Sequence, residues 1–343
     1  MLYWRGCIWL TITVLIMLAS CGNNSGEGVP EPARAVYYWR TVWQLDSTER
    51  QFLRDHDVKK IYLRFFDVKP TADGTLMPNA TLAFNDTFPA GVEIIPTVFI
   101  TENCLRYDTD SLGVAIVRRV DKMCRTRHVT AVKELQIDCD WTERSLNVYY
   151  ALLRDVKAAL KPLGWTLSVT IRLHQLSMPP PPADYGVLMV YNTGDFTEYD
   201  NPNPILSERD VAPYVKHLAK YPLPLCAAYP DFGWDLLFSG KEFKAILYGE
   251  DLNDSTIYMN VDPTRHLVIQ SRDQYQALGG QVIHLTVGDS VFTRLPAADE
   301  ILSVHDRLAQ LRPTINSQVI LYSLDSKNIN NYNKEHYEKV FSP

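Results

Sequence analysis

The sequence predicts an α/β fold of the TIM (β/α)8 barrel class. Short, apolar, β-rich runs alternate with longer helical patterns, and this alternation is typical of repeated βα units around a parallel sheet. The chain of 343 residues is also long enough for one large domain with a single core. The predicted strands cover residues 35–39, 60–66, 92–100, 134–140, 166–173, 186–191, 225–229 and 318–324.

The first 21 residues are typical of a secretory signal. Arg5 precedes an apolar run over residues 7–18, which is too short to span a bilayer comfortably. Two small residues then precede Cys21, which resembles the lipobox of bacterial lipoproteins; the alternative is an ordinary signal peptide with a chance cysteine. We expect lipidation at Cys21 and anchoring in the bacterial cell envelope. Gly22 favours the outer membrane, and residues 22–34 have the composition of a flexible tether.

The rest of the chain is expected to form the barrel, over residues 35–343. Asp46 and Glu49 have the spacing of a capping box that opens the first helix. Residues 143–160 carry apolar side chains at helical spacing, and a proline and a glycine follow. Runs at 243–248, 266–270 and 282–287 predict a β-rich excursion over residues 241–291, between the seventh strand and the last helix.

Charge and cysteine content exclude several classes of function. The net charge of −6 argues against a nucleic-acid surface. Apart from Cys7 and Cys21 the chain has Cys104, Cys124, Cys139 and Cys226, without the spacing of a zinc site. We therefore expect no metal and no cofactor. Cys104 and Cys124 are a candidate disulfide in an exported protein, and four buried thiols are the alternative.

Polar residues at the ends of strands indicate where a site would lie. The carboxyl ends of barrel strands surround the open face, whereas the middle of a barrel is packed. Alternation along residues 134–140 directs Asp138 and Asp140 into the barrel, and residues 166–173 direct Arg172 there. Other side chains expected at this mouth are Trp39, Tyr62, Arg64, Phe66, Met189, Tyr191, Asn192, Tyr229 and Trp234.

Acids beside aromatic rings suit a carbohydrate ligand, because rings stack on the apolar faces of sugars while carboxylates bind hydroxyl groups. There is a structural alternative. Asp138 and Asp140 can instead pair with Arg64 and Arg172 in a buried ionic network that only stabilises the barrel.

Three short motifs resemble those of the chitinase-like family-18 glycoside hydrolases. LQIDCDWT, residues 135–142, matches the family's D-x-x-D-x-D-x-E at Asp138 and Asp140. LSV at 167–169 and MVYN at 189–192 match its fifth and sixth strands. The chain is also similar to uncharacterised bacterial barrel proteins related to those enzymes. The motifs lie within residues 130–195.

The resemblance implies a TIM barrel that binds or hydrolyses glycans containing N-acetylhexosamine. In such an enzyme Asp140 would orient the substrate's N-acetyl group, Asp138 would tune Asp140 by sharing a proton, and Tyr191 would bond the reacting group. Substrate contacts would come from Trp39, Arg64, Arg172, Asn192, Tyr229 and Trp234.

The sequence departs from the family where the proton donor is expected. Thr142 occupies the position of the family's glutamate, and a threonine cannot supply the general acid, which is worth about 10²–10⁴ in rate. Glu143 could take this role if the strand end swings it into the mouth. Alternatively, Thr142 is an N-cap and Glu143 lies in the first helical turn. Asp231 and Glu102 are further candidate donors.

Three functions remain open from the sequence. The first is an envelope-anchored glycoside hydrolase with a displaced acid. The second is a glycan-binding lipoprotein without turnover, and the third is a structural or partner-binding envelope protein. The fold alone does not separate them, because this barrel supports many functions.

Overall fold

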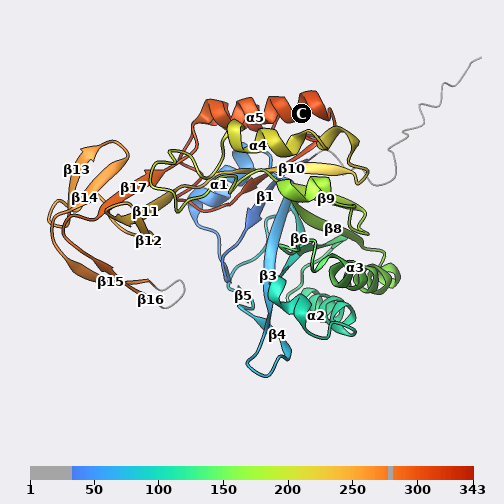
Figure 1. Cartoon of the computed structure of the whole chain (residues 1–343). Helices are drawn as coiled ribbons and strands as arrows, with labels where there is room; N and C mark the ends of the chain where they lie inside the picture. Colours follow the sequence, from blue (N-terminus) through green and yellow to red (C-terminus); the bar gives the residue numbers. More distant parts are fainter. Residues whose placement is uncertain (1–32, 277–280) are drawn as a thin grey trace, which may run out of the picture.

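The computed structural model describes residues 33–276 and 281–343, in which eight parallel strands close into a barrel (Figure 1). β1 closes the ring because it pairs with both β3 and β18. The barrel strands are β1 (Ala33–Tyr38), β3 (Lys60–Pro70), β6 (Glu93–Ile100), β7 (Glu134–Asp138), β8 (Thr166–Arg172), β9 (Tyr185–Met189), β10 (Leu225–Pro230) and β18 (Gln318–Tyr322). Each predicted strand overlaps one of these, so the predicted TIM barrel is confirmed.

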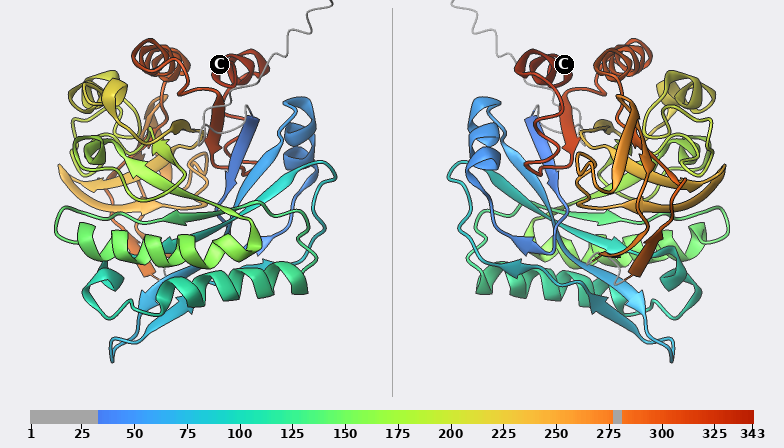
Figure 2. Two further views of the ribbon diagram at one scale, coloured as in Figure 1. Left: turned by 90° about the vertical axis from the view of Figure 1, so that its right-hand side faces the viewer. Right: turned by 90° about the vertical axis from the view of Figure 1, so that its left-hand side faces the viewer.

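Helices cover the outside of the barrel, and α2 and α3 lie side by side across one flank (Figure 2). Gly113 of α2 permits this close packing, since a Cβ there would lie only 2.9 Å from the backbone nitrogen of Val156 in α3. The α-helices are α1 (Ser47–Asp55), α2 (Leu112–Thr126), α3 (Leu146–Leu160), α4 (Glu208–Val215), α5 (Ala298–Leu311) and α6 (Lys334–Val340).

The two predicted helix starts have different outcomes. The capping box is present, because Asp46 accepts a hydrogen bond from the Glu49 backbone N–H and the Glu49 side chain accepts one from the Asp46 N–H. The helix predicted over residues 143–160 is α3, which begins at Leu146, three residues later than predicted. Thr142 is not its N-cap: the Thr142 N–H donates to Ser145 Oγ at 3.0 Å, and the two residues bracket a turn that precedes the helix.

An insertion of antiparallel strands separates β10 from α5 and projects from one side of the barrel (Figure 1). The predicted runs correspond to β12, β14 and β16, but four strands, β11, β13, β15 and β17, were not predicted, and the insertion extends beyond residues 241–291 at both ends. Its strands are β11 (Trp234–Ser239), β12 (Glu242–Leu247), β13 (Tyr258–Asp262), β14 (Arg265–Val268), β15 (Arg272–Gln276), β16 (Gln281–Leu285) and β17 (Ser290–Arg294).

Three short strands extend the barrel rim. β3 continues past its barrel neighbours and pairs antiparallel with β4 (Leu76–Asn79). β2 (Val42–Trp43) and β5 (Ala83–Phe84) form a separate parallel pair.

Hydrogen-bonded polar side chains fill the barrel interior. The Tyr37 hydroxyl donates to Gln136 at 2.9 Å. Gln318 donates to the Tyr62 hydroxyl at 2.8 Å, and that oxygen lies 2.8 Å from the Tyr185 hydroxyl. All five side chains are buried, and buried polar groups remain stable only when they are paired in this way. The packed interior leaves the strand ends as the place for a ligand.

Cys104, Cys124, Cys139 and Cys226 are buried free thiols, so the candidate disulfide is absent and the alternative is confirmed. Burial raises the pKa of Cys124 to about 12. The predicted signal, Cys21 and most of the tether lie outside the described residues. Within those residues, no helix combines the length and apolar character needed to cross a membrane.

Candidate functional site at the barrel mouth

Two acids and an arginine meet where β7 and β8 end. Asp138 closes β7 and is 3% exposed, whereas the side chain of Asp140 is 51% exposed. Thr170 Oγ1 donates to Asp138 Oδ1 at 2.6 Å, and Arg172 Nε donates to Asp140 Oδ1 at 2.5 Å. The structure therefore brings together the three residues that the strand alternation directed inward.

The charges of this trio are coupled. Burial raises the pKa of Asp138 above its ordinary value, and Arg172 opposes that rise. Burial disfavours the charged form of Arg172, but Asp138 and Asp140 together raise its pKa, so the guanidinium remains protonated. The guanidinium of Arg172 therefore stabilises the negative charge of the buried Asp138 and of the half-exposed Asp140. This arrangement agrees in part with the alternative that the acids and arginines form a buried ionic network, yet Asp140 remains exposed enough to contact a ligand.

A cavity of about 330 Å³ opens beside Asp140 and Arg172. It brings Tyr191 and Asn192, both predicted site residues, together with that ion pair. Asn192 adopts a left-handed backbone conformation, with φ of 54°, at the end of β9. The remaining lining residues are Leu173, His174, Met189, Thr193 and Tyr214.

His174 is a titratable group in this cavity that the sequence reading missed. Burial and then the positive charge of Arg172 lower its pKa, so the imidazole is neutral at neutral pH. It lies two residues after the end of β8, and a polar residue just beyond a strand end was the signal that would have identified it.

A row of aromatic rings crosses the floor of the mouth. Tyr191 stacks on Tyr322 with ring centroids 4.8 Å apart, and Trp39 lies 5.9 Å from Tyr322 on the other side. Phe232 follows at 5.7 Å from Tyr322, and Trp234 at 5.5 Å from Phe232. Of the two predicted tryptophans, Trp39 lines a cavity at the mouth, whereas Trp234 packs against Phe196 and lines neither cavity. Tyr322 was missed because its strand was identified without asking which of its residues face inward.

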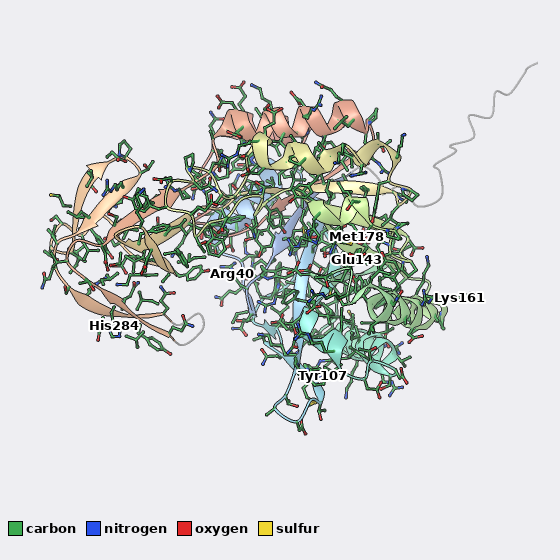
Figure 3. All side chains as sticks on the ribbon, viewed as in Figure 1. Arg40, Tyr107, Glu143, Lys161, Met178 and His284 are labelled. Atoms are coloured by element: carbon green, nitrogen blue, oxygen red, sulfur yellow. The ribbon has the colours of Figure 1, made fainter. Side chains whose placement is uncertain are left out.

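A second cavity, of about 920 Å³, lies at the Trp39 end of this row. Trp39, Arg40 and Arg64 line it from the barrel side, and Tyr248 lines it from the insertion. Figure 3 shows Arg40 at the side of the barrel that faces the insertion. The aromatic row therefore has Trp39 in this cavity and Tyr191 in the cavity beside Asp140, while Tyr322 between them lines neither.

A β-bulge in β3 changes which residues face this cavity. The register of β3 against β6 shifts between Arg64 and Phe66. Beyond the shift Phe66 faces the helix layer, where Arg119 of α2 lies over its ring, so its predicted inward position is wrong. Asp67 instead forms two hydrogen bonds with Arg64 and is 1% exposed. A strict two-residue alternation directs Asp67 away from the barrel interior, so it could not predict that Asp67 bonds to Arg64.

Tyr229 is not at the mouth, so its predicted role in substrate contact is wrong. Its side chain is fully buried, its ring lies 5.5 Å from that of His305 in α5, and its hydroxyl donates to Asn316 at 2.8 Å. In β10 it is Cys226 and Ala228 that face the interior. The prediction placed Tyr229 at the mouth because it is aromatic and lies near a strand end. The alternation of inward and outward side chains along that strand was not taken into account.

No candidate donor lines the cavity beside Asp140. Thr142 and Glu143 are exposed in the turn before α3, so Glu143 lies neither in that cavity nor in the first turn of the helix. Asp231 is 1% exposed and accepts a hydrogen bond from Tyr337 of α6. Glu102 forms an ion pair with Arg106 at 3.6 Å.

Comparison with known proteins supports the fold. No family model and no curated protein matches the sequence. The structure is similar to a chitinase from Chromobacterium violaceum, with a TM-score of 0.53 and 11% identity over 90% of this chain and 98% of that one. It is similar to the spore cortex-lytic enzyme SleL of Bacillus cereus, with a TM-score of 0.51 and 14% identity over 91% and 75%.

A third similar structure is the C-terminal domain of a putative chitinase from Desulfitobacterium hafniense, with a TM-score of 0.50 and 12% identity over 91% of this chain and 100% of that one. At such identities the similarity concerns the fold. The chain thus has a barrel fold similar to those of chitinases and of a spore cortex-lytic enzyme, so the resemblance to chitinase-like barrels is confirmed for the fold.

Proposed function

We propose that the barrel mouth binds an oligosaccharide that contains N-acetylhexosamine. The observation that carries this proposal is the row of rings from Trp39 through Tyr322 to Tyr191, whose two ends each line a cavity. The ring of Trp39 can accept the apolar face of a sugar, while Asp140 and Arg172 in the other cavity provide an acceptor and donors for hydroxyl and amide groups.

Binding without turnover is favoured by the region around Thr142. The family's proton donor is replaced by a threonine, and the neighbouring Glu143 lies outside the cavity beside Asp140. A glycosidic bond held at this cavity would therefore lack general-acid assistance.

Hydrolysis is the second candidate, and the unlike environments of Asp138 and Asp140 favour it. Burial raises the pKa of Asp138, while Asp140 is half exposed and paired with Arg172. Two neighbouring carboxyls in different environments are the usual basis for an acid and a base in one site.

Calorimetric titration of the full chain with chitin-type, peptidoglycan-type and N-glycan oligosaccharides tests binding. A zwitterionic detergent suits the experiment, since an alkyl glycoside would compete for the site. Trp39→Ala is expected to weaken binding roughly tenfold, about 1.4 kcal/mol, through loss of one stacking surface. Trp165→Ala is the matched control, because Trp165 precedes β8 at the opposite end of the barrel. Absence of binding to every glycan, or equal losses in both variants, would refute the proposal.

Mass spectrometry of the same mixtures separates binding from turnover. We expect intact glycans with the wild type and new fragments with Thr142→Glu, which restores an acid at the family's position. Fragments from the wild type that disappear in Asp140→Asn would instead establish the hydrolase and show that another group supplies the proton.

A further inference from the structure

Two cavities share a wall at the end of the barrel opposite the mouth. One, of about 600 Å³, is lined by residues 86–94 and by the segment from Arg127 to Lys133 that leads into β7. The other, of about 430 Å³, lies between α1 and the segment before β6. Both include Pro89 to Val92. We refer to the two together, bounded by residues 50–59, 86–94 and 127–133, as the basal groove.

The basal groove has five cations and four acids, a net charge of +1 in a chain whose net charge is −6. Two of its cations are neutralised locally, since Arg50 pairs with Asp86 and Lys59 pairs with Asp57. Three others are exposed and form no ion pair within the described residues, and the groove's acids outside those pairs are Asp55 and Glu93. These three free cations are Arg54, Arg127 and Lys133.

The basal groove also borders the point where the chain enters the barrel. The Lys59 N–H donates to the carbonyl of Arg34 at 2.9 Å, and the Glu93 N–H donates to the carbonyl of Lys59 at 2.8 Å. β1 therefore begins, at Ala33, beside the groove. In the sequence, Cys21, where we expect lipidation, precedes Ala33 by twelve positions, which span at most about 40 Å when extended.

The mouth and the insertion lie at the other end of the molecule. Lys161, at the end of α3 and just before β8, is on the side opposite the insertion and Arg40 (Figure 3). A membrane that held a lipid on Cys21 would thus tether the chain from the end of the barrel that carries the basal groove.

We propose that the basal groove docks on an anionic membrane surface and so directs the barrel mouth away from the membrane. Headgroup phosphates would meet Arg54, Arg127 and Lys133, and a cation near an anionic bilayer strengthens association about fivefold. The lipidation that we expect at Cys21 makes a lipid surface the occupant. This proposal is independent of what the mouth binds.

Hydrogen–deuterium exchange of the full chain in lipid nanodiscs tests the docking. We expect peptides that cover residues 86–94 and 127–133 to exchange more slowly in discs with phosphatidylglycerol than in discs of phosphatidylcholine alone. Peptides at the mouth, such as residues 39–46, are expected to exchange equally in both. Slower exchange at the mouth, or no difference at the groove, would overturn the proposal.

Two controls make the result specific. The triple variant Arg54→Gln, Arg127→Gln, Lys133→Gln should lose the protection, whereas Arg118→Gln, Arg307→Gln, Lys327→Gln removes the same charge from exposed positions elsewhere and should retain it. Equal protection in both variants contradicts a role for the groove. Glycerol phosphate is added to the phosphatidylcholine discs as a third arm, and protection by it alone would indicate a small-anion site instead of membrane docking.

Discussion

Arg172→Met tests whether the charges of Arg172, Asp138 and Asp140 at the mouth depend on one another. The substitution removes the cation that faces both Asp138 and Asp140. Removing one partner of a buried pair costs about 3–5 kcal/mol. Because Asp140 is half exposed and water can serve its charge, we expect the lower end, about 3 kcal/mol at neutral pH. For a domain of this size that corresponds to a fall in Tm of about 5 °C.

The pH dependence distinguishes this explanation from simple loss of packing. The folded-state pKa of Asp138 is already raised, so the folded protein loses stability as pH rises from the ordinary aspartate pKa to the raised one. Without Arg172 that pKa rises further, which extends the loss to higher pH. Stability of the variant should therefore recover on acidification.

Thermal melts across pH, with Asp138→Asn and the double variant, complete a mutant cycle. We expect Arg172→Met to cost much less in the Asp138→Asn background, because no buried carboxylate remains there. An equal cost in both backgrounds, or a cost that does not vary with pH, would refute the reasoning. Arg118→Met, at an exposed position on α2, is the matched control.

Three further predictions concern the barrel and its helices. Asp231 is buried against Tyr337 and burial raises its pKa well above its usual range, so Asp231→Asn should melt higher than the wild type at alkaline pH but not at acidic pH; parallel curves would contradict this. Tyr37→Phe leaves Gln136 without its donor and should cost about 1–2 kcal/mol in denaturant unfolding, and an unchanged midpoint would refute the pairing. Gly113→Ala should cost about 1–3 kcal/mol by forcing α2 from Val156, whereas Val114→Ala, exposed on the same helix, should be nearly neutral.

The sequence was informative wherever a local pattern repeats. Eight strands, the capping box at Asp46 and the β-rich insertion follow from periodicity and spacing that act within a few residues. The inward direction of Asp138 and Arg172 follows from the same alternation, because neither β7 nor β8 contains a bulge in its pairing. It was less informative where the backbone departs from the repeat. One shift in β3 reversed the sides of Phe66 and Asp67.

Other features depend on segments that are distant in the chain. Tyr322 joins the aromatic row because β18 returns beside β1 and β10, nearly 300 residues after the first strand. The basal groove unites α1 with the segments before β6 and β7. No local pattern predicts such neighbours.

The sequence by itself thus determined the barrel, its insertion and the acids at the end of β7, since hydrophobic alternation selects which face of each strand is buried. Only the tertiary structure decided that Arg172 binds Asp140, that Tyr229 faces α5 and that Glu143 stays outside the cavity beside Asp140. The physical reason is that pairing partners, bulges and cavities result from closure of the whole sheet. A strand's own residues fix its periodicity but not its neighbours.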